Sequence, residues 1–88
     1  MEIRQTSQFK KDVRRSKKRN KDFSKFKVVI DYLVQKIELP EEYQDHQLIG
    51  NYLGSRECHL EPDWLLIYRI EGNVLILIRL GTHSDLFS

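Results

Sequence analysis

Three histidines in the second half of the chain are the residues best suited to chemistry. His46 follows an aspartate, His59 opens the sequence His-Leu-Glu-Pro-Asp-Trp at 59–64, and His83 closes Gly-Thr-His. An imidazole has an unperturbed pKa of about 6.5, so it can give or take a proton near neutral pH. Strands placed between these segments would bring the three rings and the Asp63 carboxylate to one surface.

Cleavage of RNA by transesterification is one reaction that such a cluster could perform. It needs a base for the 2′-OH proton, an acid for the departing 5′-oxygen, and positive charge near the phosphate. The histidines could transfer the protons, and Asp63 could act as a base or orient a histidine. The charge could come from arginines of the second half, namely Arg56, Arg69 and Arg79.

Two aromatic residues could stack on bases, Phe87 near the end of the sequence and Trp64 at a strand entrance. A tryptophan at a strand entrance is more often part of the core, and the alternative for Arg69 and Arg79 is a position at the edge of the sheet without a role in chemistry. The spacing of cysteines, histidines and carboxylates matches no metal-binding motif, and the glycine-flanked serine of a nucleophile elbow is absent. We therefore expect no metal and no cofactor.

Charge is distributed unevenly along the 88 residues. Residues 1–27 hold eleven Lys and Arg against three acidic residues, a net +8, and residues 28–88 hold four against ten, a net −6. The basic block is either a solvated helix face or a footprint for nucleic acid, in which cations displace the counterions of phosphates. Its RNA-binding candidates are Lys10, Lys11, Arg14, Arg15, Lys17, Lys18 and Lys21.

The first half reads as a strand over 2–6 and two helices. Thr6 or Ser7 can cap the first helix, and Asn20 suits its end. The second helix begins near Asp22, carries an apolar stripe from Phe23 to Ile37, and is ended by Pro40.

The second half reads as strands. Residues 56–60 alternate, which places Glu57 and His59 on an exposed face opposite Cys58 and Leu60. Residues 65–70 and 74–80 are apolar on both faces, as in central strands, and Gly72-Asn73 supplies a hairpin turn between them. Residues 85–88 form a short tail.

The order of these elements predicts one α+β domain over 1–88. An N-terminal strand joins a mainly antiparallel sheet of four to five strands, two helices pack on one face, and a concave polar face stays open for a ligand. The apolar runs are too short to span a bilayer, no signal peptide is evident, and a single cysteine fits the cytoplasm.

Three motifs at compatible spacing resemble the YafQ-type toxins of the RelE/ParE superfamily. They are Asp-His-Gln-Leu-Ile-Gly at 45–50, Arg-Glu-Cys-His-Leu-Glu-Pro-Asp-Trp-Leu-Leu-Ile-Tyr at 56–68, and Arg-Leu-Gly-Thr-His-Ser-Asp-Leu-Phe at 79–87. The resemblance covers nearly the whole chain. It implies a RelE-like fold and a ribosome-dependent endoribonuclease that cuts mRNA in the A site and is neutralised by a cognate antitoxin.

The resemblance also implies roles for single residues. His46, His59, Asp63 and His83 would act in catalysis, and Phe87 would help to hold the mRNA. We add further candidates for RNA contact from the same strands: Trp64, Glu57, Arg56 and Arg79. The superfamily also contains toxins that poison gyrase without cutting RNA, so a non-catalytic ParE-like toxin or a nucleic-acid-binding module is the alternative.

Overall fold

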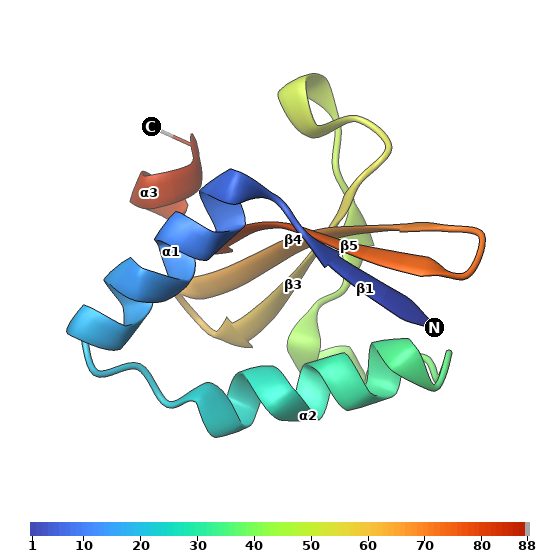
Figure 1. Cartoon of the computed structure of the whole chain (residues 1–88), viewed down its shortest axis with the longest axis horizontal. Helices are drawn as coiled ribbons and strands as arrows, with labels where there is room; N and C mark the ends of the chain where they lie inside the picture. The colour runs from blue at the N-terminus through green and yellow to red at the C-terminus, as the bar shows by residue number, and fades with distance from the viewer. Residues whose placement is uncertain (88) are drawn as a thin grey trace.

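The computed structural model describes residues 1–87 and shows a five-stranded mixed sheet with helices on both faces (Figure 1). Along the chain the elements are β1 (Glu2–Gln5), α1 (Ser7–Lys18), α2 (Phe23–Val34), the 3₁₀ turn η1 (Glu41–Tyr43), β2 (His46–Gln47), the 3₁₀ turn η2 (Gly50–Tyr52), β3 (Arg56–Glu61), β4 (Trp64–Glu71), β5 (Val74–Gly81) and α3 (His83–Phe87). The strand order is β1-β5-β4-β3-β2. Only the β1–β5 pair is parallel, so the predicted fold class is confirmed.

Local signals account for the first helix. The Thr6 hydroxyl accepts a hydrogen bond from the Phe9 amide at 3.0 Å and so caps the N-terminus of α1. Asn20 takes the left-handed conformation, with φ of 59°, just beyond the C-terminus. The Lys21 amide then donates to the Ser16 carbonyl, which closes the helix in a Schellman motif as the sequence indicated.

The second helix ends six residues before Pro40, so its predicted end was wrong. Lys36 adopts φ of 59°, and the amides of Lys36 and Ile37 donate to the carbonyls of Leu33 and Tyr32. This second Schellman motif stops α2 at Val34. Ile37, which was expected in the apolar stripe, is therefore 50% exposed.

Two apolar clusters lie on the two faces of the sheet. On the helix face Trp64, Leu66 and Tyr68 of β4 pack with residues of α1 and α2, among them Phe9 and Val29. On the other face Leu65 and Ile67 are fully buried under Leu86, Leu48, Tyr52 and Ile78. The sequence had suggested that this face is open and polar. The structure shows instead that apolar side chains cover part of it.

The predicted tail at 85–88 is wrong for its described residues, because they belong to the short helix α3; residue 88 lies outside the described part. Thr82 and Asp85 form a reciprocal cap that starts α3 directly after β5. Leu86 then faces the second apolar cluster. Among residues 1–87 no helix is long and apolar enough to cross a membrane.

Candidate active site

The three histidines come from three different elements and form a row. His46 lies on β2, His59 on β3, and His83 is the first residue of α3. The ring centroids of His46 and His59 are 6.2 Å apart, and those of His59 and His83 are 5.8 Å apart. The convergence predicted from the sequence is present, and we call these three residues the histidine row.

Glu57 lies beside two members of the histidine row. One of its carboxylate oxygens is 3.1 Å from Nε2 of His59 and 3.6 Å from Nε2 of His46. Glu57 is on the predicted face of β3 but is only 4% exposed, so the expectation of an exposed side chain that meets RNA directly was wrong. β2 on one side and β4 on the other flank this residue. A buried carboxylate at this distance can orient both imidazoles.

Asp63 holds the third histidine. Its Oδ1 accepts the backbone N–H of His83 at 2.9 Å and lies 2.6 Å from Nδ1 of the same ring. These two hydrogen bonds, the backbone one first, lower the pKa of Asp63. Because Nδ1 of His83 faces the carboxylate, Nε2 is the ring nitrogen left for another partner.

Three donor atoms of the site are close enough to bind a divalent cation. One atom each from Glu57, His59 and His83 lie within 4.8 Å of one another. Carboxylate and imidazole donors suit zinc and copper. No sequence spacing predicted this set, since its members come from β3 and from the start of α3.

Arg79 lies on the same face as Glu57, two strands away. Glu57 is opposite Ile67, and Ile67 is opposite Arg79, so the three residues form one row across the sheet. The guanidinium donates to both oxygens of Asp12, at 2.8 and 3.3 Å, and to the hydroxyl of Tyr52 at 3.3 Å. A guanidinium fixed in this way keeps its orientation, and its side chain is 17% exposed.

Asp12 is a fully buried carboxylate that the sequence did not single out. Burial opposes its ionisation, but hydrogen bonds from Arg79 and from the Leu80 amide outweigh burial, and the pKa of Asp12 lies below its usual range. Arg15 adds a further contact at 3.1 Å. The ionised carboxylate is thus paired on several sides, which a buried charge requires.

Tyr52 and Phe87 form an aromatic edge to the site. Their ring centroids are 5.9 Å apart with planes at 89°, an edge-to-face arrangement. With Ile49, Asn51 and Leu86 they line a pocket of about 230 Å³. Phe87 is 48% exposed. Sequence reasoning missed Tyr52, because it lies in an irregular segment.

Trp64 and Arg56 do not join the histidine row. Trp64 is 1% exposed; its ring packs edge-on against Phe23, and its Nε1 is 3.3 Å from the Ser16 hydroxyl. The prediction that Trp64 stacks on RNA was therefore wrong, because α1 and α2 cover it. Arg56 shares the helix side of β3 with Cys58, opposite Glu57, and is held by Asp45 at 3.0 Å. Arg56 was therefore also placed wrongly beside the site.

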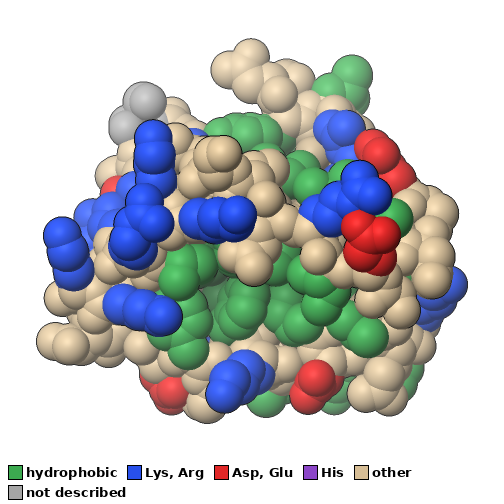
Figure 2. Space-filling model, in the orientation of Figure 1, with side chains coloured by type: hydrophobic (Ala, Val, Ile, Leu, Met, Phe, Trp, Pro, Cys, Tyr) green, Lys and Arg blue, Asp and Glu red, His purple; other side chains and the backbone are tan. Residues whose placement is uncertain are grey.

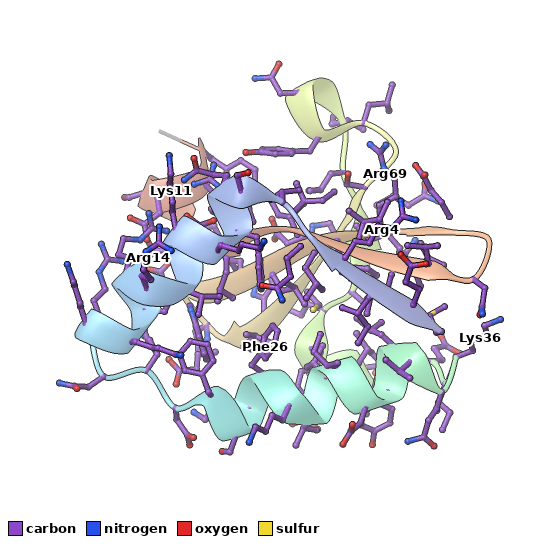
Figure 3. All side chains as sticks on the ribbon, in the orientation of Figure 1. Arg4, Lys11, Arg14, Phe26, Lys36 and Arg69 are labelled. Atoms are coloured by element: carbon purple, nitrogen blue, oxygen red, sulfur yellow. The ribbon has the colours of Figure 1, made fainter. Side chains whose placement is uncertain are left out.

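The predicted basic block separates into free and paired residues. Arg15 pairs with Asp12 and Asp85, and Lys21 pairs with Glu61. Among residues 1–87 the other five have no ion pair and are exposed; we call them the basic stripe: Lys10, Lys11, Arg14, Lys17 and Lys18. Figure 3 shows Lys11 and Arg14 projecting outward from α1, and Figure 2 shows Lys and Arg side chains gathered over α1 on a face where no histidine is visible. The basic stripe and the histidine row are thus separate surfaces.

Comparison with known proteins identifies the family. A family model described as "Bacterial toxin of type II toxin-antitoxin system, YafQ" matches residues 1–88. The chain belongs to the YafQ toxin family.

Known YafQ proteins match over nearly their whole length. The mRNA interferase toxin YafQ of Escherichia coli is 41% identical over 87 residues, which cover 98% of this chain and 95% of the relative. The crystal structure of the E. coli DinJ-YafQ complex contains a chain with TM-score 0.91 and 41% identity, with 99% and 98% of the two chains covered. A metal-bound toxin from Helicobacter pylori has TM-score 0.92 and 39% identity, with 99% of each chain covered.

Proposed function

We propose that this YafQ-family chain is a ribosome-dependent endoribonuclease that cuts mRNA in the A site by acid–base catalysis without a metal. The observation that carries the proposal is the histidine row, with Glu57 and Asp63 hydrogen-bonded to its members. The name mRNA interferase, which the E. coli relative carries, supports the same activity. Ribosomes are its site of action, so it acts in the cytoplasm.

Two proton transfers are divided among the histidine row and Asp63. One group takes the proton of the 2′-OH, the 2′-oxygen attacks phosphorus, and another group gives a proton to the departing 5′-oxygen. A cyclic phosphate and a 5′-hydroxyl result, so the reaction needs no oxidant or co-reactant. Neighbouring rings about 6 Å apart can reach the attacking 2′-oxygen and the departing 5′-oxygen on the two sides of one phosphorus atom.

Arg79 stabilises the charge that develops on the phosphate. Its guanidinium is positioned before the substrate arrives, because Asp12 and Tyr52 hold it. Preorganised charge stabilises a transition state without reorganisation during the reaction. Phe87 stacks on a neighbouring base, and its edge-to-face contact with Tyr52 holds the two rings in place.

A cleavage assay on a translated message tests the proposal. Primer extension is performed with and without ribosomes, using purified toxin that is either untreated or stripped of metal by EDTA, with the EDTA removed before the assay. We expect cuts within codons only when ribosomes are present, and equal cutting by the untreated and the metal-stripped toxin. Absence of cutting on ribosomes, or loss of cutting by the metal-stripped toxin, would contradict the proposal.

The alternative is a toxin that binds its target without cutting, for which the basic stripe would be the contact surface. Variants separate the two functions. Replacement of the histidine row by alanine abolishes toxicity if the protein is a nuclease, and leaves it intact if the protein only binds. Charge reversal in the basic stripe abolishes toxicity in the second case.

Zinc or copper should inhibit the enzyme rather than activate it. An ion bound by Glu57, His59 and His83 would occupy the atoms needed for proton transfer. The H. pylori relative has been crystallised as a metal-bound toxin, which supports metal binding by this fold. Micromolar Zn²⁺ should slow cleavage on ribosomes, and EDTA should restore the rate. A rate increase with Zn²⁺ would show that the metal has a catalytic role.

A cognate antitoxin is the natural partner, as DinJ is for the E. coli protein. We expect an acidic antitoxin segment, disordered until it binds, to lie along the basic stripe and over residues 83–87. An apolar groove beside the basic stripe suits the same segment; Figure 2 shows apolar side chains between α1 and α2 there, and its lining includes Ile3, Phe9, Val13, Phe23, Phe26 and Ile30. Amide exchange of the free and bound toxin checks this placement. Protection confined to β2 and β3 would contradict it.

A further inference from the structure

Helix α3 has two residues of the proposed reaction but little intrinsic stability. It spans only His83–Phe87, with His83 in the histidine row and Phe87 at the aromatic edge. An isolated helix of five residues does not form in water, because nucleation costs more than one turn returns. Contacts from outside α3 must therefore set the positions of both side chains.

Asp85 makes the first set of these contacts. The hydroxyl of Thr82 accepts the Asp85 amide at 3.1 Å, and Oδ2 of Asp85 accepts the Thr82 amide at 2.9 Å. This reciprocal cap satisfies two backbone donors at the start of α3. It also places His83 between the two capping residues.

Asp85 also forms ion pairs with Arg15 of α1 and with Arg19, the residue directly after α1. Arg19 donates to both carboxylate oxygens, at 2.7 and 3.3 Å, and Arg15 lies 3.5 Å away. Arg15 also donates to the Leu80 carbonyl at 2.9 Å, so it ties the end of β5 to the same point. The Asp85 side chain is only 15% exposed, whereas the side chain of Arg19 is 45% exposed.

Gly81 makes this close approach possible. A Cβ on Gly81 would lie 2.7 Å from Nη2 of Arg15 and 2.9 Å from Cβ of Asp85. No side chain fits there without displacing the ion pair. The glycine of the Gly-Thr-His motif is thus explained by space for Arg15 and Asp85.

We propose that Asp85 is a positioning residue, and that its pairing with Arg15 and Arg19 fixes α3 so that His83 and Phe87 meet the RNA. The proposal rests on the nuclease function above. We call this group of three side chains the α3 clamp. Arg15 and Arg19, both from the basic N-terminal third, therefore act on the active site by fixing α3 and do not contact RNA.

The opposite assignment makes Arg15 and Arg19 part of the RNA-contact surface, and the two assignments predict opposite effects. If the arginines contact RNA, Asp85→Asn frees them and ribosome binding becomes tighter. If the α3 clamp is correct, Asp85→Asn loosens α3 and lowers kcat by about tenfold or more, because small misplacements of reacting groups are costly. Ribosome affinity then stays within about twofold.

The experiment measures kcat and ribosome affinity of the wild type, Asp85→Asn, Arg19→Gln and Gly81→Ala, together with amide exchange of residues 82–87. Asp31→Asn is the matched control, since Asp31 is an exposed aspartate of α2 without an ion pair among residues 1–87. We expect lower kcat and faster exchange confined to residues 82–87 in all three variants, and neither change in the control.

Unchanged exchange at 82–87, or an unchanged kcat, in Asp85→Asn would overturn the α3 clamp. Circular dichroism and thermal unfolding show whether each variant is folded. If Gly81→Ala does not fold, the Arg19→Gln variant tests the α3 clamp in its place. Exchange is measured without ribosomes, so it judges the clamp even if the wild type fails to cut mRNA. That failure would instead contradict the proposed nuclease function.

Discussion

The side chains around the active site are of two kinds. Some face the proposed substrate, and others hold the first kind in place through hydrogen bonds. His46 and His83 are about half exposed, with side-chain exposures of 49% and 53%, and can meet RNA directly. Glu57 and Asp12 are buried and act on His59 and Arg79 through hydrogen bonds. Substitutions in the first group should change the reaction alone, while substitutions in the second should also change stability.

The histidines provide the most direct test at this scale. Each of His46→Ala, His59→Ala and His83→Ala should lower the single-turnover cleavage rate by about 10²–10⁴-fold, the usual contribution of a positioned acid or base. Ribosome binding and the melting temperature should change little for the exposed His46 and His83. Asp63→Asn should cause a loss as large as that of the histidine variants if Asp63 is the base, and a smaller loss if it only orients His83. Full activity in all three histidine variants would contradict the mechanism.

Asp12 predicts both a stability loss and its pH dependence. Asp12→Asn should destabilise the protein by roughly 3 kcal/mol in urea unfolding at pH 7, because it leaves the mostly buried Arg79 guanidinium without its charged partner. The folded pKa of Asp12 is below the unfolded value of about 3.9. Its stabilising contribution is therefore complete above about pH 4 and is lost as the pH falls toward the folded pKa.

Melting curves of wild type and Asp12→Asn between pH 2.5 and 7 measure this dependence. Arg79, Arg15, Gln8 and the Leu80 amide face the carboxylate, and the arginines stay charged over this range. The difference between the two melting temperatures should be largest near neutral pH and shrink below pH 4. A difference independent of pH would mean that the charge of Asp12 is not what stabilises the fold.

At the scale of elements, the ends of the helices decide what faces the site. α1 and α2 both stop in Schellman motifs, at Asn20 and at Lys36, and the segment after α2 leads into η1 and β2. The Gln44 carbonyl, just after η1, lies 2.6 Å from Nδ1 of His46. The turn that ends at Gln44 therefore helps to orient the first member of the histidine row.

Lys36 offers a test of this helix end. A non-glycine residue in the left-handed conformation costs roughly 1–2 kcal/mol. Lys36→Gly should therefore raise the free energy of unfolding by about 1 kcal/mol. Lys27→Gly is the matched control within α2, where glycine should destabilise by roughly 0.5–1 kcal/mol. Destabilisation by both substitutions, measured in urea, would contradict the assigned C-terminal motif.

What the sequence could predict at this scale depends on how local the signal is. Asn20 and the Gly72-Asn73 turn act within a few residues, and the structure confirmed both. The burial of Trp64 and Glu57 depends on which elements cover them, which alternation along one strand does not reveal. The Asp12–Arg79 pair joins residues 67 positions apart, so no spacing rule could find it.

For the whole molecule, the separation of charge from chemistry is the main feature. In the proposed function, the basic stripe on α1 binds ribosomal RNA while the histidine row, on another surface, meets the mRNA. The histidine row could be predicted from residue types and motifs. The division of the basic block could not, because Arg15 and Lys21 are paired by residues of distant segments.

Salt dependence tests the role of the basic stripe. If five or six phosphates are neutralised, ribosome affinity should fall by roughly 10³-fold between 50 and 200 mM salt. Replacing Lys10, Lys11 and Lys17 by glutamine should reduce the slope by about three counterions and leave cleavage at saturating ribosomes intact. A flat salt response in the wild type would make the basic stripe a solvated helix face.

The parallel pairing of β1 with β5 has a consequence for how the protein is made. Glu2 pairs with Val74 and Gln5 with Leu77, so β1 can take its place in the sheet only after β5 has been synthesised. Contacts between such distant residues slow folding. α3 and His83 follow β5 directly. A nascent chain that has not yet reached residue 83 therefore lacks a complete histidine row, and under the proposed function it cannot yet cut RNA.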